Sequence, residues 1–243
     1  MNRAALKRSL DVYYRDRART ARMDRLNAQV VRDGCLAFDI GAHVGDRTAS
    51  FRRLGARVVA VEPQPRVFRA LRLIHHRDPG VTLRNMAVGD TAGEVTFHIN
   101  SANPTVSTAS ADLLRAAPHA AAWHRETWDS TLQVPVTTLD AMIQEHGVPD
   151  FTKIDVEGFE ADVLAGLSQA LPVLSFEITT LQRAIGIACV ARLGALGSYV
   201  FNLSLGEDHA FQYDTWLGPD AMIQVLKMLP DAANSGDVYA KRV

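Results

Sequence analysis

The chain has 243 residues, of which 47% are hydrophobic and 22% charged, and its formal net charge is −1. This composition is typical of an ordinary globular domain, and it excludes a disordered chain, a fibre and a disulfide scaffold. It also argues against bulk nucleic-acid binding, which needs a basic face, and no apolar run is long enough to predict a transmembrane helix or a secretory signal.

Residues 1–33 are the basic part of the chain, with nine basic and four acidic side chains. Residues 4–33 contain neither Gly nor Pro, and Leu6, Leu10 and Tyr13 recur at helical spacing, which predicts one amphipathic helix. We interpret 1–33 as a helical extension and 34–243 as a single domain.

From Leu36 onward, short apolar runs alternate with helical stretches. This alternation predicts an α/β fold with a doubly wound, mostly parallel sheet. The predicted strands are 36–40, 58–61, 81–85, 151–154, 173–178 and 199–202, and the predicted helices are 48–54, 65–75, 139–146, 159–171 and 180–193. Two added strands, 94–99 and 132–136, flank an insertion.

That insertion, residues 100–131, has weak periodicity, and a connection of this length is often functional. We expect it near the mouth of the active site, where it covers or selects the substrate. An irregular surface loop is an equal alternative. The two cysteines, Cys35 and Cys189, lie in apolar surroundings without metal-binding spacing. They predict buried, reduced thiols in a cytoplasmic protein.

The turn after the first strand reads DIGAHVGDRT. In a doubly wound sheet, ligands bind at the carboxyl ends of the strands, and glycines let a ligand approach the backbone closely. We assign cofactor binding to this turn, at Asp39, Gly41, Ala42, His43, Gly45 and Thr48. Glu62 ends the second strand, 23 residues after Asp39, where a carboxylate can accept both hydroxyls of a ribose.

The spacing of the glycines indicates which nucleoside cofactor binds. A dinucleotide site requires G-x-G-x-x-G and a P-loop requires G-x-x-x-x-G-K, and neither pattern is present here. An acid before the loop suits a cationic ligand, and S-adenosylmethionine carries a sulfonium and an ammonium group. A nicotinamide-dependent oxidoreductase remains the nearest enzyme alternative.

The motifs DIGAHVGDRT, VVAVEPQP, RNMAVGDTAGEVTFH, VPVTTLD, FTKIDVEGFEADVLAG and LSFEIT occur in this order. Together they resemble the FkbM-type S-adenosylmethionine-dependent methyltransferases over about residues 36–202. The resemblance implies the class I, Rossmann-like methyltransferase fold and methyl transfer to a hydroxyl of a small molecule or sugar. His43 stands where many relatives carry Asn.

The end of the third strand lies beside the adenine ring in this fold. The resemblance therefore assigns Asn85, Met86 and Ala87 to the cofactor, together with Pro63 after the second strand. A plain strand-to-turn exit is the alternative, because Gly89-Asp90 is a turn signal.

Charged residues follow the fourth predicted strand in the string KIDVEGFE. A hydroxyl acceptor must lose a proton, which a nearby carboxylate can take. Asp155 is the first candidate for base or acceptor positioning and Glu157 the second. Lys153 is expected to orient Asp155, and Glu177 to join the pair.

Glu160 has a structural interpretation, because a carboxylate is favourable at the N-terminus of the next helix. We assign no metal ligand, but three carboxylates at adjacent strand ends leave Mg²⁺ as an open alternative. The expected partner is a small-molecule or carbohydrate acceptor, not a nucleic acid. An inactive domain that binds the cofactor also stays open, and so does the oligomeric state.

Overall fold

A computed structural model describes residues 3–243 of the chain. Its main sheet has seven strands in the order β3-β2-β1-β7-β8-β10-β9, all parallel except β10. The strands are β1 Leu36–Ile40, β2 Arg57–Val61, β3 Val81–Arg84, β7 Phe151–Ile154, β8 Val173–Thr179, β9 Tyr199–Leu205 and β10 Ser235–Arg242. The predicted doubly wound, mostly parallel sheet is confirmed.

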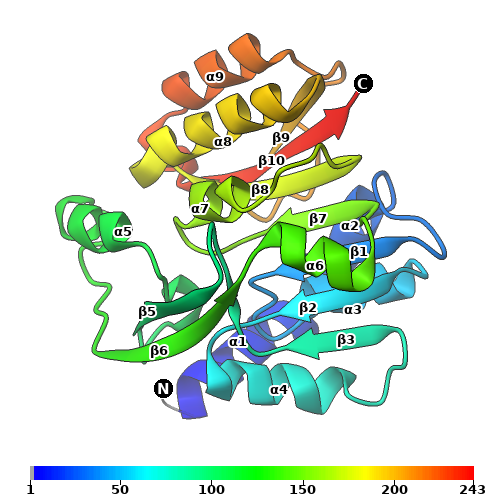
Figure 1. The fold of residues 1–243 in the computed structure, drawn as a ribbon. Helices are drawn as coiled ribbons and strands as arrows, with labels where there is room; N and C mark the ends of the chain where they lie inside the picture. The colour runs from blue at the N-terminus through cyan, green and yellow to red at the C-terminus, as the bar shows by residue number, and fades with distance from the viewer. Residues whose placement is uncertain (1–2) are drawn as a thin grey trace.

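Helices cover both faces of this sheet (Figure 1). Side chains alternate along a strand, so Phe38 and Ile40 of β1 pack into one core and Ala37 into the other. The first core is closed by α6 Leu139–His146, α7 Glu160–Ala165, α8 Arg183–Leu196 and α9 Pro219–Met228, and the second by α3 Asp46–Arg53 and α4 Pro65–His75. The result is a three-layer α/β/α domain.

A second, three-stranded sheet lies beside the first (Figure 1). It consists of β4 Ala87–Val88, β5 Gly93–Ile99 and β6 Ser130–Thr137, so both predicted added strands are confirmed. The segment between β5 and β6 carries η1 Pro104–Val106, α5 Ala111–Ala116 and η2 Ala117–His119. Leu113, Ala117 and Trp123 give this segment a small apolar core of its own.

The basic N-terminal segment is two helices, α1 Arg3–Arg15 and α2 Arg17–Asn27, so the prediction of one helix over 4–33 is wrong. The chain is extended at Asp16, whose carboxylate accepts a hydrogen bond from the backbone N–H of Arg19. Such an N-cap starts a new helix. Residues 1 and 2 of the predicted extension lie outside the described residues.

The helices of the extension pack against the rest of the domain. Leu6, Leu10 and Tyr13 of α1 contact a cluster that includes Val44 and Val67. Leu26 of α2 joins the core beneath α3. The apolar face predicted for this segment is therefore confirmed.

Two other predictions need correction. The helix expected over 159–171 ends at Ala165, because Gly166 lies against the backbone of Gly89, where a Cβ would come within 2.2 Å of the carbonyl oxygen. The sequence analysis missed α9 and β10 altogether. β10 inserts antiparallel between β8 and β9 and completes the sheet.

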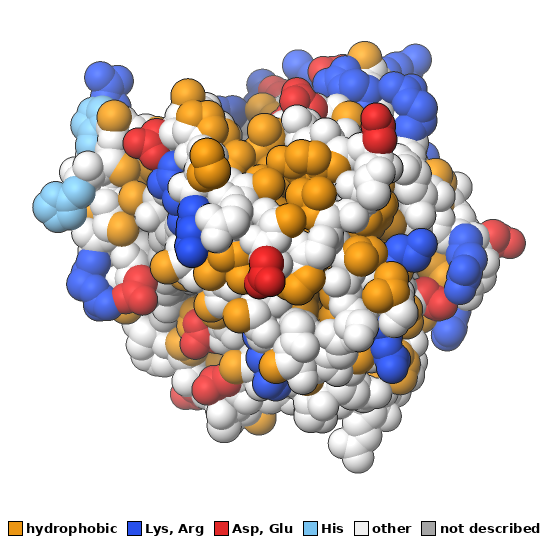
Figure 2. All heavy atoms as spheres, turned by 90° about the horizontal axis from the view of Figure 1, so that it is seen from above, with side chains coloured by type: hydrophobic (Ala, Val, Ile, Leu, Met, Phe, Trp, Pro, Cys, Tyr) orange, Lys and Arg blue, Asp and Glu red, His pale blue; other side chains and the backbone are white. Residues whose placement is uncertain are grey.

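Figure 2 shows the side of the molecule on which α8 and α9 lie. Apolar side chains gather at its centre, and Lys and Arg side chains are interspersed with Asp and Glu around the rim. Within residues 3–243, no helix has the length and apolar character needed to cross a membrane. Cys35 and Cys189 are buried and free, as predicted.

Candidate active site

The register of the main sheet brings the predicted site residues to one level. Ile40, the last residue of β1, pairs with Val61 of β2 and Ile154 of β7, and Ile154 pairs with Phe176 of β8. The residues that follow these four positions therefore lie side by side, three of them just beyond their strands and Glu177 within β8, where it pairs with Asp237 of β10. They are Gly41, Glu62, Asp155 and Glu177.

A cleft opens at this edge, with a void of about 1210 Å³ that includes its solvent-filled mouth. Eight carboxylates and three basic side chains line it. The carboxylates are Asp39, Asp46, Glu62, Asp155, Glu157, Glu177, Glu207 and Asp237, and the basic residues are Arg19, Arg47 and Lys153. A cleft of this charge favours a cationic ligand.

At the end of β1, the chain turns sharply against the end of β7. Gly41 has a φ of +81°, and a Cβ there would lie 1.7 Å from the carbonyl oxygen of Asp155, so only glycine fits. Asp39 is 1% exposed and accepts a hydrogen bond of 2.5 Å from the Thr48 hydroxyl. Burial raises the pKa of Asp39 to about 6.

At the end of β2, Glu62 is 3% exposed and held by the backbone. Its Oε2 accepts from the N–H of His43 at 3.0 Å, and its Oε1 accepts from the N–H of Gln64 at 2.8 Å. Burial raises the pKa of Glu62 to about 7. These contacts fix the carboxylate at the cleft wall before any ligand binds.

Most of the predicted site residues line the cleft. They are Asp39, Gly41, Ala42, His43, Glu62, Pro63, Met86, Ala87, Lys153, Asp155 and Glu157. Gly45, Thr48 and Asn85 lie behind the residues that line the cleft, and their assignment to the cofactor stays a prediction.

Each of these three residues supports the wall. Gly45 precedes α3 with a φ of +86° and packs tightly against Leu71 and His75 of α4. Thr48 bonds Asp39, as described above. The Asn85 amide donates to the carbonyl oxygens of Glu62 and Pro63, which ties the turn after β2 to the end of β3.

His43 presents an unusual side chain to the cleft. Its φ is +47°, and its ring meets that of Tyr13 edge-on, with the ring centroids 5.6 Å apart. Neither ring nitrogen has a hydrogen-bond partner among the described residues. Burial lowers the pKa of His43 to about 4, so the ring is neutral near pH 7. Two polar atoms are thus left for a ligand.

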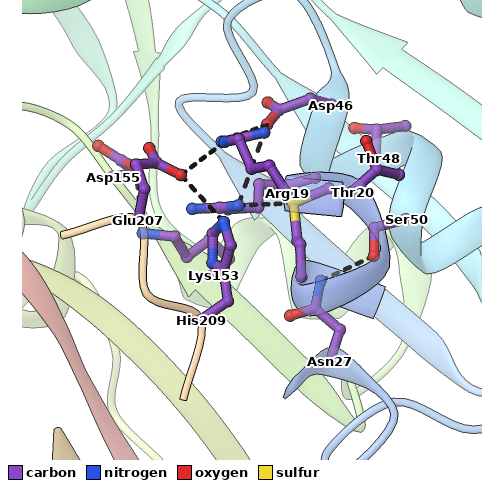
Figure 3. A network of polar contacts seen from close by, with 12 residues as sticks. Arg19, Thr20, Asn27, Asp46, Thr48, Ser50, Lys153, Asp155, Glu207 and His209 are labelled. Atoms are coloured by element: carbon purple, nitrogen blue, oxygen red, sulfur yellow. Dashed lines mark hydrogen bonds and ion pairs between the residues drawn. The ribbon is translucent and has the colours of Figure 1, made fainter. Parts of the chain in front are cut away.

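At the end of β7, Lys153 and Asp155 form a buried ion pair, as the sequence analysis expected (Figure 3). The Lys153 Nζ lies 3.1 Å from Asp155 Oδ2 and 2.5 Å from Asp237 Oδ1. Burial raises the pKa of Asp155, but the charge and hydrogen bond of Lys153, the charge of Arg47 and a hydrogen bond with Glu177 together outweigh it, and the pKa is lowered. Asp155 is therefore a stable anion and a weak base.

Glu157 and Glu177 differ from Asp155 in having no cation of their own. Glu157 adopts a φ of +54° and is 9% exposed. Glu177 Oε2 is buried and lacks a hydrogen-bond partner in the described part of the chain. Burial, and then the charge of Asp155, raise the pKa values of both carboxyls well above the usual range.

Glu160 has the structural role that was expected of it. Its Oε1 accepts hydrogen bonds from the N–H groups of Val156 and Gly158, at 3.1 and 3.2 Å. Its carboxylate thereby shapes the loop that carries Glu157. Burial raises the pKa of Glu160 to about 7.

The sequence analysis missed the residues that the N-terminal helices bring to the cleft. The Arg19 side chain is 6% exposed and lies between Asp46 and Glu207, with contacts of 3.1 and 2.7 Å (Figure 3). Arg47 is nearby, with its Nη1 2.6 Å from Met23 Sδ and 4.0 Å from Asp46 Oδ2. The one signal for these residues was the excess of Arg in the segment.

The insertion reaches the mouth of the cleft, as predicted. Thr105, Ser107 and Ala109 are part of its lining. The Gln64 amide donates to the carbonyl oxygen of Pro104 at 3.0 Å and so ties the insertion to the turn after β2. Trp123 lies instead in the small core of the insertion.

Comparisons with known proteins agree with this geometry. The family model described as the methyltransferase FkbM domain matches residues 39–227. The chain is also similar to the hexuronic acid methyltransferase AglP of Haloferax volcanii, with 23% identity over 192 residues, which cover 76% of this chain and 72% of the relative.

Two solved structures are similar in shape. A precorrin-6y C5,15-methyltransferase from Geobacter metallireducens superimposes with a TM-score of 0.49 and 13% identity, over 91% of this chain and 88% of that one. A TehB-like SAM-dependent methyltransferase from Corynebacterium glutamicum gives a TM-score of 0.48 and 12% identity, over 100% of both chains.

Proposed function

Because this chain belongs to the FkbM methyltransferase family, and is therefore an S-adenosylmethionine-dependent methyltransferase, we propose that it methylates a hydroxyl group of a sugar or sugar-like acceptor. The observation that carries the proposal is the cluster of Asp155, Glu157 and Glu177. These carboxylates lie together at the cleft, and the buried Oε2 of Glu177 has no hydrogen-bond partner among residues 3–243. Such groups accept hydrogen bonds from hydroxyls.

The residues of the cleft fit the cofactor. Glu62 is fixed in place to accept the ribose hydroxyls, and the acidic wall suits the sulfonium and the ammonium group. Met86 and Pro63 offer apolar surface beside Glu62 for the adenine. Arg47, which has no carboxylate closer than the 4.0 Å contact with Asp46, is a binding group for the cofactor's own carboxylate. When bound, S-adenosylmethionine supplies an electrophilic methyl group, which leaves sulfur for the acceptor oxygen.

The acceptor end supplies orientation and a place for the proton. As the new C–O bond forms, the hydroxyl proton must go to a base. Glu157 is suited to this task, because burial and then the charge of Asp155 raise its pKa, which makes it a stronger base than Asp155. Asp155 stays ionised beside Lys153 and positions the hydroxyl. Glu157 is thus the first candidate for the base and Asp155 the second, whereas the sequence suggested the opposite order.

A sugar is favoured over other alcohols by two observations. Its adjacent hydroxyls match several carboxylate acceptors spaced a few ångströms apart, and one oxygen from each member of the cluster lies within 4.8 Å of the others. The curated relative also acts on a hexuronic acid, according to its name. A simple monohydric alcohol would leave most of these acceptors unused.

The test is methyl transfer from S-adenosylmethionine carrying a ¹³C-labelled methyl group. The acceptors are matched glycosides of a neutral hexose, a hexuronic acid and an amino sugar, and NMR identifies the methylated atom. An O–CH₃ product with at least one glycoside supports the proposal. Methylation at nitrogen alone, or only of acceptors without sugar hydroxyls, contradicts it. Cofactor binding without turnover on any acceptor would favour the alternative of an inactive cofactor-binding domain.

A further inference from the structure

The carboxylate cluster beside β7 and β8 offers oxygen ligands for a metal ion. We propose that Asp155, Glu157 and Glu177 bind one divalent cation, Mg²⁺ or Mn²⁺, beside the cofactor. One carboxylate oxygen of each residue contributes to the site. Nothing else in the family assignment or the relatives' names specifies a metal, so the inference depends on these side chains alone.

The distances suit a hard cation with oxygen ligands. One oxygen from each residue lies within 4.8 Å of the other two. Around an ion with metal–oxygen distances of about 2.1–2.4 Å, opposite ligands are roughly 4.2–4.8 Å apart and adjacent ones are closer. The three oxygens therefore surround a central ion after small side-chain movements. The parallel pairing of β7 with β8 fixes this spacing.

The second observation is that the cluster is incomplete without a ligand. The Glu157 side chain lines the cleft, is nine-tenths buried, and has no ion-pair partner among residues 3–243. Glu177 Oε2 is completely buried and also unpartnered among them. Burying such acceptors is unfavourable unless a partner satisfies them. Glu160, by contrast, is satisfied by backbone N–H groups and takes no part.

The charges of the surrounding groups point the same way. Lys153 is already shared between Asp155 and Asp237. Together with Glu157 and Glu177, these residues place four carboxyl groups around one ammonium group, and of the other cations only Arg47 acts on Asp155 and Asp237 among residues 3–243. A divalent cation would offset this excess of carboxyl groups, and no side chain of the described residues offers Glu157 or Glu177 an ion pair within 4.0 Å.

The ion would also have a use in the reaction, and this part of the inference rests on the proposed function. Three protein oxygens leave about half of a six-coordinate shell open to water or to two neighbouring hydroxyls of a sugar. Binding to the ion makes a hydroxyl more acidic.

Direct binding of Mn²⁺ to the full chain, measured by electron paramagnetic resonance without an acceptor, tests the site. We expect one Mn²⁺ per chain with a dissociation constant below about 1 mM, displaced by Mg²⁺. Glu157→Gln and Glu177→Gln each weaken binding by at least about tenfold. Both changes remove a buried negative charge, so the variants are expected to fold. The control Glu94→Gln alters an exposed carboxylate on β5 and leaves binding unchanged.

Absence of Mn²⁺ binding, with and without S-adenosylmethionine, overturns the inference. So does binding that survives both cluster variants. A Glu177→Asp variant, which keeps the charge, must bind more tightly than Glu177→Gln. The proposed function is judged separately. If methyl transfer to a sugar continues in EDTA, the reaction does not need the ion and the proposed function stands. If Mn²⁺ binds but no sugar is methylated, the metal site stands and the proposed function is wrong.

Discussion

The two ends of the cleft differ in whether their carboxylates have hydrogen-bond donors from the same chain. At the cofactor end, Asp39 and Glu62 already accept hydrogen bonds from Thr48, His43 and Gln64 of the same chain. At the proposed acceptor end, Glu177 has a buried oxygen without such a donor among residues 3–243, and Glu157 lies 9% exposed at the cleft.

This difference shows how one sheet edge serves two purposes. Carboxylates bound by the backbone are held in place and recognise a ligand of fixed shape. Unpartnered carboxylates cost stability, and a fold keeps them where a ligand, a proton or an ion completes them. Variants at the cofactor end should therefore change affinity for S-adenosylmethionine, and variants at the acceptor end should change turnover.

The largest expected effect is that of Asp155→Asn on catalysis. Loss of the anion that positions the acceptor should lower kcat by about 10²–10⁴, while the dissociation constant of S-adenosylmethionine changes by less than about threefold. Single-turnover kinetics and titration calorimetry measure the two quantities. A large loss of cofactor affinity with kcat retained would move Asp155 to the cofactor end and break the comparison.

Lys153→Met should have the largest effect on stability. It leaves Asp155 and Asp237 buried without their shared cation, and breaking such a buried pair costs about 3–5 kcal/mol. Urea unfolding followed by circular dichroism gives the free energy. The control is Lys227→Met on the exposed face of α9, which should change stability by less than about 0.5 kcal/mol. Equal effects of the two changes would show that Lys153 is not the centre of the network.

The pH dependence of cofactor binding tests the state of Glu62. Its raised pKa of about 7 means that the folded protein holds the protonated form more readily than the unfolded chain does. The stabilisation from this proton is complete below the ordinary pKa of a glutamate and is lost as the pH rises through 7.

A cationic cofactor requires the ionised form of Glu62. Affinity for S-adenosylmethionine should therefore be about tenfold weaker at pH 6 than at pH 8, with a proton released on binding. Calorimetry in buffers of different ionisation enthalpy measures both quantities. Glu62→Gln should bind more weakly and lose this pH dependence. An unchanged pH profile in that variant would assign the titration to another group.

Arg47→Met examines the part of the cleft that the N-terminal helices close. We expect about tenfold weaker binding of S-adenosylmethionine, the loss of one charge-assisted contact. Binding of methylthioadenosine, which has no carboxylate, should be unchanged. The matched control is Arg25→Met on the exposed face of α2. If both ligands lose affinity equally, Arg47 supports the fold of the cleft and does not contact the cofactor's carboxylate.

Thr48→Val should have the smallest effect. It removes the donor to Asp39 while keeping the shape of the side chain, so cofactor affinity should fall by about two- to fivefold with little change in kcat. Titration calorimetry again provides the measurement. A loss larger than that of Glu62→Gln would mean that the wall behind Asp39, and not the carboxylate at the end of β2, determines binding.

Local sequence was a good guide where one short segment decides its own structure. β1, β7, α4 and α6 begin and end where they were predicted. Pro65 at the first position of α4 and the Thr138 hydroxyl that caps α6 are signals carried within a few residues. The break at Asp16 was missed because an aspartate is compatible with both the interior of a helix and its N-cap.

The residues of the candidate site also differ in whether local sequence could identify them. Strand ends with acids after them identified Asp39, Glu62, Lys153, Asp155 and Glu157. The contributions of Tyr13 and Arg19 depend on α1 and α2 folding back across the cleft, and that of Asp237 on β10 entering the sheet beside β8. No periodicity or spacing in the chain reports such distant neighbours.

The sequence by itself determined the alternation of strands and helices, the family, the cofactor and the strand ends where its ligands lie, because each of these is written in contiguous motifs. Only the tertiary structure decided which carboxylates are satisfied and which are left open. That property depends on donors and on burial supplied by segments far apart in the chain: Thr48 and the turn backbone for Asp39 and Glu62, and the meeting of β7, β8 and β10 for Asp155, Glu157 and Glu177.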